Sequence, residues 1–169
     1  MGGLMAAEAV ALAEAERLLA LLRAQGTRVV TAESCTGGLV AATLTALPGA
    51  SAVLAGGYVT YSNEMKQSAL GVSARLLKQH GAVSEAVARA MAEGARKRSG
   101  ADLSVALTGI AGPEGGSAEK PVGLVFIAVA GAEGTRVTRQ EFAGGRAAVR
   151  GASVRAALSL LRDMAERGA

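Results

Sequence analysis

The 169-residue sequence has few of the residues that many catalytic and metal-binding sites use. It contains one cysteine, Cys35, one histidine, His80, no tryptophan and only 2% aromatic residues. A lone cysteine excludes an internal disulfide, and a lone histidine argues against a histidine-rich zinc site or a Ser-His-Asp triad. We therefore predict no metal, no cofactor and a reducing, cytoplasmic compartment.

The charge balance favours small anionic ligands. The net charge is +4, from 18 Lys and Arg against 14 Asp and Glu, which indicates anionic partners. The aromatic side chains on which single-stranded nucleic acids stack are nearly absent. We therefore expect a small anionic ligand and no nucleic acid.

Residues 1–22 are apolar enough to raise the question of a signal peptide or membrane anchor. The charged residues Glu8, Glu14, Glu16 and Arg17 argue against both, so we expect no membrane association. The apolar residues recur at helical spacing, which predicts an amphipathic helix lying on the domain. They are Leu4, Ala11, Leu12, Ala15, Leu18, Leu19 and Leu22.

The order of the expected elements indicates one α/β domain over residues 1–169. Half of the residues are hydrophobic but only 2% are aromatic, so we expect an aliphatic core. After the first helix the pattern predicts strands at 27–32, 53–61, 103–107, 122–130 and 135–142, and helices at 39–47, from about 62, and at 74–79, 85–98 and 146–166. This order predicts a three-layer α/β/α sandwich with a mixed, mostly parallel sheet.

Three expected strands end in conspicuous loops, at 33–38, 61–66 and 108–116. Ligands of open α/β sheets bind beyond the carboxyl ends of the strands. Ser34 lies where a strand turns into a helix, near the backbone NH groups of Thr36, Gly37 and Gly38, which can stabilise an oxyanion. Ser34 is therefore a candidate nucleophile, and the alternative is an ordinary helix N-cap.

A serine nucleophile needs a base, and the only histidine lies outside these loops. Lys66 is the best candidate, because a helix N-terminus and partial burial both lower the pKa of a lysine. Tyr61, in the same loop, is placed to relay or orient the proton. The alternatives are an exposed helical lysine and a packing tyrosine. Cys35 is a rival nucleophile, or else a small buried residue.

Two further segments are candidate substrate-binding sites. The glycine-rich loop with Thr108, Gly109 and Gly112 can bring backbone close to a ligand, although it lacks the ending of a P-loop and can also be a plain turn. Arg146 and Arg150 lie four residues apart at the start of the last helix. A phosphate bound by both guanidinium groups would explain cations at this position, and the alternative is two solvated arginines.

Four motifs run in order through nearly the whole chain: residues 31–38 (TAESCTGG), 59–64 (VTYSNE) with Lys66, 80–84 (HGAVS), and 108–113 (TGIAGP) with Gly115 and Gly116. Together they resemble the CinA C-terminal domain family, in particular its stand-alone nicotinamide-nucleotide amidases. The aspartate of the family's Gly-Asp-Arg segment is Gly145 here. Many relatives carry a further molybdopterin-binding-like domain, without a counterpart in these 169 residues, so we expect no pyrophosphatase activity.

The resemblance implies an amidase that converts nicotinamide mononucleotide and water to nicotinate mononucleotide and ammonia. It implies that Ser34 attacks the carboxamide, Lys66 accepts its proton and Tyr61 assists, while Thr108 and the glycine loop hold the substrate. The alternatives are a catalytically silent nucleotide-binding module and a structural subunit that regulates a partner. We also expect a homo-oligomer, with a dimer through the first helix favoured.

Overall fold

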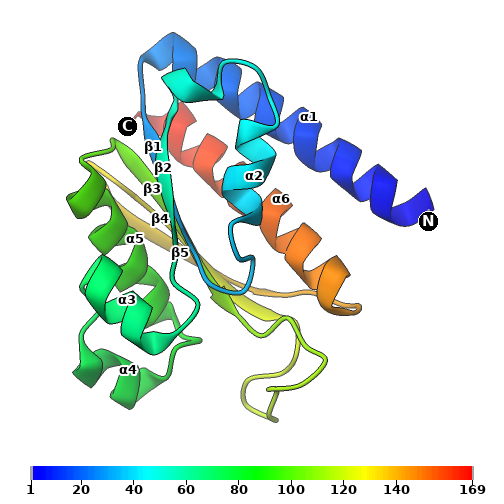
Figure 1. The fold of residues 1–169 in the computed structure, drawn as a ribbon, viewed down its shortest axis with the longest axis vertical. Helices are drawn as coiled ribbons and strands as arrows, with labels where there is room; N and C mark the ends of the chain where they lie inside the picture. The colour runs from blue at the N-terminus through cyan, green and yellow to red at the C-terminus, as the bar shows by residue number, and fades with distance from the viewer. Residues whose placement is uncertain (1, 169) are drawn as a thin grey trace.

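A five-stranded sheet with helices on both faces organises the chain (Figure 1). The computed structural model describes the backbone of residues 2–168 and the side chains of residues 9–168. The strands are β1 (Val29–Glu33), β2 (Leu54–Val59), β3 (Leu103–Gly109), β4 (Leu124–Gly131) and β5 (Gly134–Glu141). The helices are α1 (Gly2–Gln25), α2 (Leu39–Thr45), α3 (Asn63–Leu70), α4 (Ala74–His80), α5 (Glu85–Ser99) and α6 (Arg146–Arg167), with a 3-10 turn η1 (Ala50–Ala52).

The sheet has the order β2-β1-β3-β4-β5. Strand β1 pairs in parallel with β2 and β3, and β4 pairs antiparallel with β3 and β5. Four strands therefore run in one direction and β4 runs against them. This confirms the predicted mixed, mostly parallel sheet and the hairpin of the last two strands.

Each face of the sheet carries its own apolar layer, as expected for a three-layer sandwich. Helices α1, α2 and α6 cover one face, and α3, α4 and α5 cover the other (Figure 1). On α1, the side chains of Leu18 and Leu22 are fully buried, but Leu12 is 38% exposed. Leu12 therefore does not belong to the packed stripe that its spacing predicts, and the side chain of Leu4 lies outside the described residues.

Three serines start helices, as their positions in the sequence predict. Ser62, Ser73 and Ser84 each accept a hydrogen bond from the backbone NH three residues later, at the starts of α3, α4 and α5. Such caps satisfy NH groups that have no partner within the helix. The cap at Ser62 matters for the site, because it sets where α3 begins and hence where Lys66 lies.

Helix α3 packs closely against α5 through a glycine. A methyl group on Gly94 of α5 would overlap the carbonyl oxygen of Leu70, the last residue of α3. Only a residue without a side chain lets the two backbones approach this far. Gly94 therefore fixes how deeply α3, with Lys66, lies against the rest of the fold.

None of the helices described combines the length and the apolar stretch that crossing a bilayer requires.

Candidate active site

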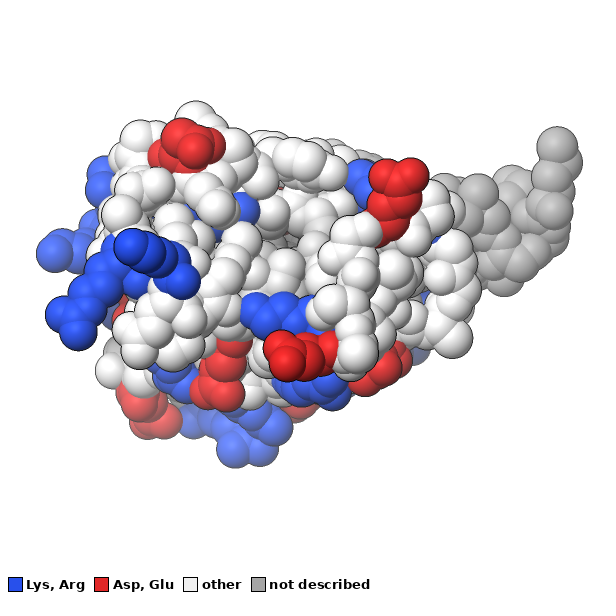
Figure 2. All heavy atoms as spheres, turned by 90° about the horizontal axis from the view of Figure 1, so that it is seen from below, with Lys and Arg blue, Asp and Glu red and all other residues white. Residues whose placement is uncertain are grey.

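The carboxyl ends of three neighbouring parallel strands bring the predicted loops together. Strand β1 lies between β2 and β3, with Glu33 paired to Val59 on one side and to Leu107 on the other. The segments that follow β1, β2 and β3 therefore leave the same edge of the sheet. Figure 2 views the molecule from this side and shows basic and acidic side chains interspersed over the described surface.

Lys66 lies directly beside Ser34. Its Nζ is 3.1 Å from Ser34 Oγ, 2.9 Å from the carbonyl oxygen of Thr60 and 3.3 Å from that of Tyr61. A neutral amine has two N–H bonds and one lone pair. When the two carbonyls accept those N–H groups, the lone pair faces the Ser34 hydroxyl, and this is the arrangement a general base needs.

Burial lowers the pKa of Lys66. Its side chain is only 1% exposed, and removal from water disfavours the charged form, which lowers its pKa from the ordinary 10.5. The ionised forms of Cys35 and Glu64 would each raise this pKa, by less than burial lowers it. The predicted pairing of a serine with a buried lysine of lowered pKa is thus present in the structure.

The turn that holds Ser34 uses the NH groups of both glycines, contrary to the prediction that they are free. The NH of Gly37 donates to the carbonyl oxygen of Ser34 at 3.0 Å, and the NH of Gly38 donates to the Glu33 carboxylate at 3.1 Å. Both glycines have a positive φ, so they shape a tight turn. Within the described chain, the NH groups of Cys35 and Thr36 donate to no oxygen and interact with the Cys35 sulfur, and they are the remaining candidates for an oxyanion site.

Cys35 is a small buried residue and is poorly suited to be the nucleophile. Its side chain is 7% exposed, and burial raises the pKa of its thiol to about 11. A thiol in this state is protonated near neutral pH, whereas a cysteine nucleophile must react as the thiolate. The structure therefore favours Ser34 over its neighbour.

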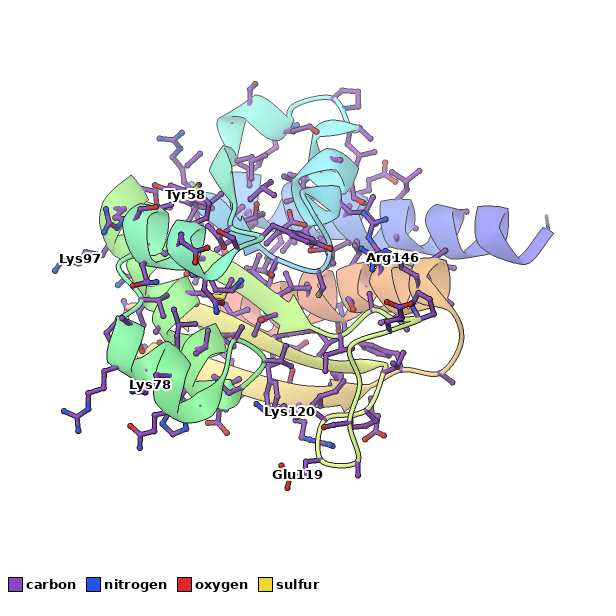
Figure 3. The ribbon with its side chains drawn as sticks, turned by 60° about the horizontal axis from the view of Figure 1, so that its bottom comes forward. Tyr58, Lys78, Lys97, Glu119, Lys120 and Arg146 are labelled. Carbon is purple, nitrogen blue, oxygen red and sulfur yellow. The ribbon has the colours of Figure 1, made fainter. Side chains whose placement is uncertain are left out.

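Tyr61 contacts Lys66 through its backbone, not through its hydroxyl. The carbonyl of Tyr61 accepts from Lys66, and its phenol oxygen accepts from Arg146 Nη2 at 2.9 Å. Arg146 also donates through Nη1 to the carbonyl oxygen of Gly112 at 3.0 Å. In Figure 3, Arg146 lies at the start of α6, beside the loop that carries Lys120. Tyr61 and Arg146 thus join the loops after β2 and β3. Among the described residues, no hydrogen bond links the Tyr61 hydroxyl to Lys66 or Ser34, so the structure gives no support to the predicted proton relay.

From α6, Arg150 approaches the nucleophile turn, residues 34–38, which carries the candidate nucleophile Ser34. Its Nη2 donates to the carbonyl oxygen of Thr36 at 2.8 Å, and its buried Nε has no hydrogen-bond partner in the described part of the chain. Among the ion pairs found between described residues, none includes Arg146 or Arg150. Both guanidinium groups therefore meet only neutral oxygens, which leaves their charge available to an anion.

A groove adjoins the two arginines. It has a volume of about 980 Å³ and lies between α1, α2 and α6, with Arg146 and Arg150 among its lining residues. Its other walls are largely apolar, from residues such as Leu39 and Val154. The space beside the arginines is thus wide enough for a ligand larger than a phosphate group.

Thr108 and Gly109 are the last residues of β3 and not, as predicted, the start of the glycine-rich loop, and together with Gly112 they make contacts within the fold. The Thr108 hydroxyl donates to the carbonyl oxygen of Ala82 at 2.8 Å. A methyl group on Gly109 would come within 2.7 Å of the Leu124 carbonyl oxygen, and one on Gly112 would overlap Val122. Thr108, Gly109 and Gly112 therefore have packing roles that explain their residue types. The Thr108 hydroxyl, the one polar side-chain group among the three, donates its proton within the fold.

The sequence reasoning missed one residue, Glu33. The sequence pattern places Glu33 in the loop, but it is the last residue of β1 and its side chain is fully buried. A charged residue directly after the apolar run Val29–Ala32 was the available signal, because carboxylates are almost never buried without partners. No cluster of three or more metal-ligating side chains occurs within the described residues.

Fold and site together define an α/β protein in which a serine and a buried lysine meet beyond the carboxyl ends of parallel strands. The family model of the CinA C-terminal domain matches residues 11–165. The chain therefore belongs to the CinA C-terminal domain family.

Known proteins resemble the chain in both sequence and structure. A CinA-like protein of Anaeromyxobacter sp. (strain K) is 56% identical over 147 residues, which cover 87% of this chain and 36% of that protein. A CinA-like protein of Parasynechococcus marenigrum is 55% identical and matches over 86% of this chain and 35% of its own length. The chain thus spans about a third of the length of these curated relatives.

The solved structures match over nearly their whole length. The competence/damage inducible protein CihA from Agrobacterium tumefaciens aligns with a TM-score of 0.90 at 46% identity and covers 92% of this chain and 95% of its own. A CinA superfamily protein from Klebsiella pneumoniae 700603 aligns with a TM-score of 0.89 at 38% identity and covers 93% and 98%. These matches confirm the α/β fold and the predicted family.

Proposed function

We propose that the chain is a nicotinamide-nucleotide amidase that converts nicotinamide mononucleotide and water to nicotinate mononucleotide and ammonia. The observation that carries the proposal is the 3.1 Å contact between Ser34 Oγ and the buried Lys66 Nζ. Membership of the CinA C-terminal domain family supports it, because this family includes such amidases. The chemistry requires only a serine, a base and water, and so needs no metal.

In the proposed mechanism Lys66 moves one proton in both halves of the reaction. Ser34 Oγ attacks the carboxamide carbon while its proton passes to Lys66 Nζ. The tetrahedral intermediate collapses as Lys66 returns the proton to the leaving nitrogen, and ammonia departs from a serine ester. Water then attacks the ester carbon and gives a proton to Lys66, the ester bond breaks, and nicotinate mononucleotide leaves with Ser34 reprotonated.

The proposed substrate also matches the charges around the site. Nicotinamide mononucleotide carries a phosphate, and Arg146 and Arg150 offer guanidinium groups that no described acid neutralises. We assign the phosphate to these arginines and the developing oxyanion to the NH groups of Cys35 and Thr36. Tyr61 acts by holding Lys66 through its carbonyl and Arg146 through its hydroxyl.

A turnover assay tests the proposal. Purified protein incubated with nicotinamide mononucleotide in the presence of a chelator should release ammonia, and Ser34→Ala should reduce the rate at least about 10³-fold while the circular dichroism spectrum stays unchanged. Cys35→Ser is the matched control, because it changes the neighbouring nucleophile and should keep most of the activity. Full activity in Ser34→Ala would overturn the mechanism.

The same assay separates the amidase from a catalytically silent nucleotide-binding module. A silent module would bind nicotinamide mononucleotide in a calorimetric titration without releasing ammonia. A panel of pyridine nucleotides, assayed in parallel, identifies which one the site turns over fastest.

A further inference from the structure

A single carboxylate organises the nucleophile turn. The Glu33 side chain is fully buried. It accepts hydrogen bonds from the Thr36 hydroxyl at 2.7 Å and from the NH groups of Gly38 at 3.1 Å, Val40 at 3.0 Å and Ala41 at 2.9 Å. No ion pair found among the described residues includes it, so hydrogen bonds to neutral donors stabilise the charge.

These bonds replace the helix cap that α2 lacks. The residue at the N-cap position is Gly38, which has no side chain to accept from the first NH groups. Glu33 supplies the acceptor from five residues earlier in the chain, at the end of β1. The strand end, the turn and the helix start are thus bonded to one group, and Ser34 lies inside this loop of contacts.

The same bonds decide which NH groups are left for chemistry. Glu33 occupies those of Gly38, Val40 and Ala41, which would otherwise form the anion-binding end of the helix. The NH of Ser34 donates to the Leu107 carbonyl oxygen and that of Gly37 to the Ser34 carbonyl oxygen, so the oxyanion donors that remain in the turn are the NH groups of Cys35 and Thr36.

We propose that Glu33 is a positioning residue of the active site, whose buried carboxylate holds the turn so that Ser34 Oγ faces Lys66 Nζ. This inference rests on the proposed amidase function. Glu33 does not touch the substrate or transfer a proton. It acts through the backbone, and an error of about 1 Å in the position of a nucleophile can cost about 10²-fold in rate.

The test uses Glu33→Gln, which keeps the shape of the side chain but turns an NH₂ group toward backbone donors. We expect kcat for ammonia release to fall about 10- to 100-fold, KM to change by less than about 3-fold, and the pH profile to keep its acidic limb, because Lys66 retains its partners. Ser73→Ala is the matched control. It removes the cap of α4, away from the nucleophile turn, and should lower the melting temperature without lowering kcat.

A second measurement keeps the inference separate from the proposed substrate. Phenylmethanesulfonyl fluoride reacts with activated serines, and intact-mass spectrometry measures its rate at Ser34. Glu33→Gln should slow this labelling by a factor similar to the fall in kcat. If Glu33→Gln does not fold, Thr36→Val removes one of the four bonds and should slow labelling, whereas Thr36→Ser keeps the hydroxyl and should restore the rate.

The outcomes distinguish the positioning role of Glu33 from the proposed amidase function. Labelling or turnover in folded Glu33→Gln at the wild-type rate, or a loss no greater than in Ser73→Ala, overturns the inference. Wild-type protein that labels at Ser34 but releases no ammonia contradicts the proposed function, and slower labelling of Glu33→Gln still supports the inference. Wild-type protein that neither labels at Ser34 nor releases ammonia overturns both ideas together.

Discussion

Burial of a single lysine is the residue-level feature on which the proposed chemistry depends. Water stabilises an ammonium group strongly, so a lysine that is 1% exposed has its pKa lowered and is neutral at a lower pH than a surface lysine. The carbonyls of Thr60 and Tyr61 hold this amine toward Ser34. Burial of this amine should therefore affect both the rate and the stability of the protein.

The rate should depend on the charge of Lys66. Because the neutral amine is the base, kcat should rise with pH and reach a plateau above the lowered pKa of Lys66. Arginine stays protonated, so Lys66→Arg should lose this limb and reduce kcat about 10²- to 10⁴-fold. Initial rates of ammonia release across pH measure both effects. An unchanged limb in the variant would show that another group titrates.

Stability should also depend on pH through Lys66. Between its lowered folded pKa and the unfolded value of 10.5, the unfolded chain binds more protons, so the free energy of unfolding rises with pH in this window, by at most about 1.4 kcal/mol per pH unit. Lys66→Met should lack this slope in urea titrations. Readings should stay below pH 9.0, because the raised pKa of Cys35 produces the opposite slope above that value. If the free energy of unfolding changed with pH in the same way in the wild-type protein and in Lys66→Met, the prediction would be wrong.

At the level of elements, the close packing of α3 on α5 determines whether Lys66, the proposed base, reaches Ser34. Lys66 lies in α3, which ends at Leu70, and the Leu70 carbonyl lies against Gly94 of α5. The helix that carries Lys66 is thus positioned by a contact away from Ser34. Any side chain at Gly94 has to push α3 outward.

Gly94→Ala should therefore lower both stability and activity. Overpacking of this kind costs about 1–3 kcal/mol, and the displaced α3 should reduce kcat several-fold by moving Lys66 away from Ser34. Gly151→Ala is the matched control, because the nearest atom to its new methyl group is a flexible arginine end at 3.8 Å. Alanine in place of a helical glycine should stabilise the protein by about 0.5–1 kcal/mol. Thermal unfolding and initial rates of both variants test this prediction. Equal kcat values for Gly94→Ala and Gly151→Ala would argue against the positioning of Lys66 by the α3–α5 contact.

At the scale of the whole molecule, α1 presents apolar side chains to solvent next to a groove. Val10 is 58% exposed and Leu12 is 38% exposed, and Leu12 also lines the groove between α1, α2 and α6. Apolar surface of this kind is often buried against a partner. We therefore keep the prediction of a homodimer formed through the first helix.

Light scattering coupled to gel filtration tests this prediction. The wild-type protein should elute with about twice the 16.8 kDa mass of one chain. Leu12→Glu should shift the mass toward a single chain, because a buried carboxylate without a partner is costly. A wild-type mass of one chain would contradict the prediction, and a dimer unaffected by Leu12→Glu would place the interface elsewhere.

Local patterns were sufficient to predict most of the fold. The hairpin of β4 and β5, the caps at Ser62, Ser73 and Ser84, and the strand-turn-helix around Ser34 all follow from residues close together in the chain. Leu12 shows the limit of such patterns. Its helical spacing predicts that it is buried with the other apolar residues of α1, but it is 38% exposed. Spacing identifies a stripe, but the neighbouring helices decide how much of it they cover.

The sequence by itself determined which residue types stand at the strand ends, and so the candidates Ser34 and Lys66. Only the tertiary structure decided which of these groups meet, because the hydrogen bonds between them join segments far apart in the chain. Lys66 meets Ser34 across 32 residues, and Arg146 meets the Tyr61 hydroxyl across 85. Glu33 lies next to Ser34, but its role depends on its burial, which comes from the packing of β1 between two strands and beneath α2.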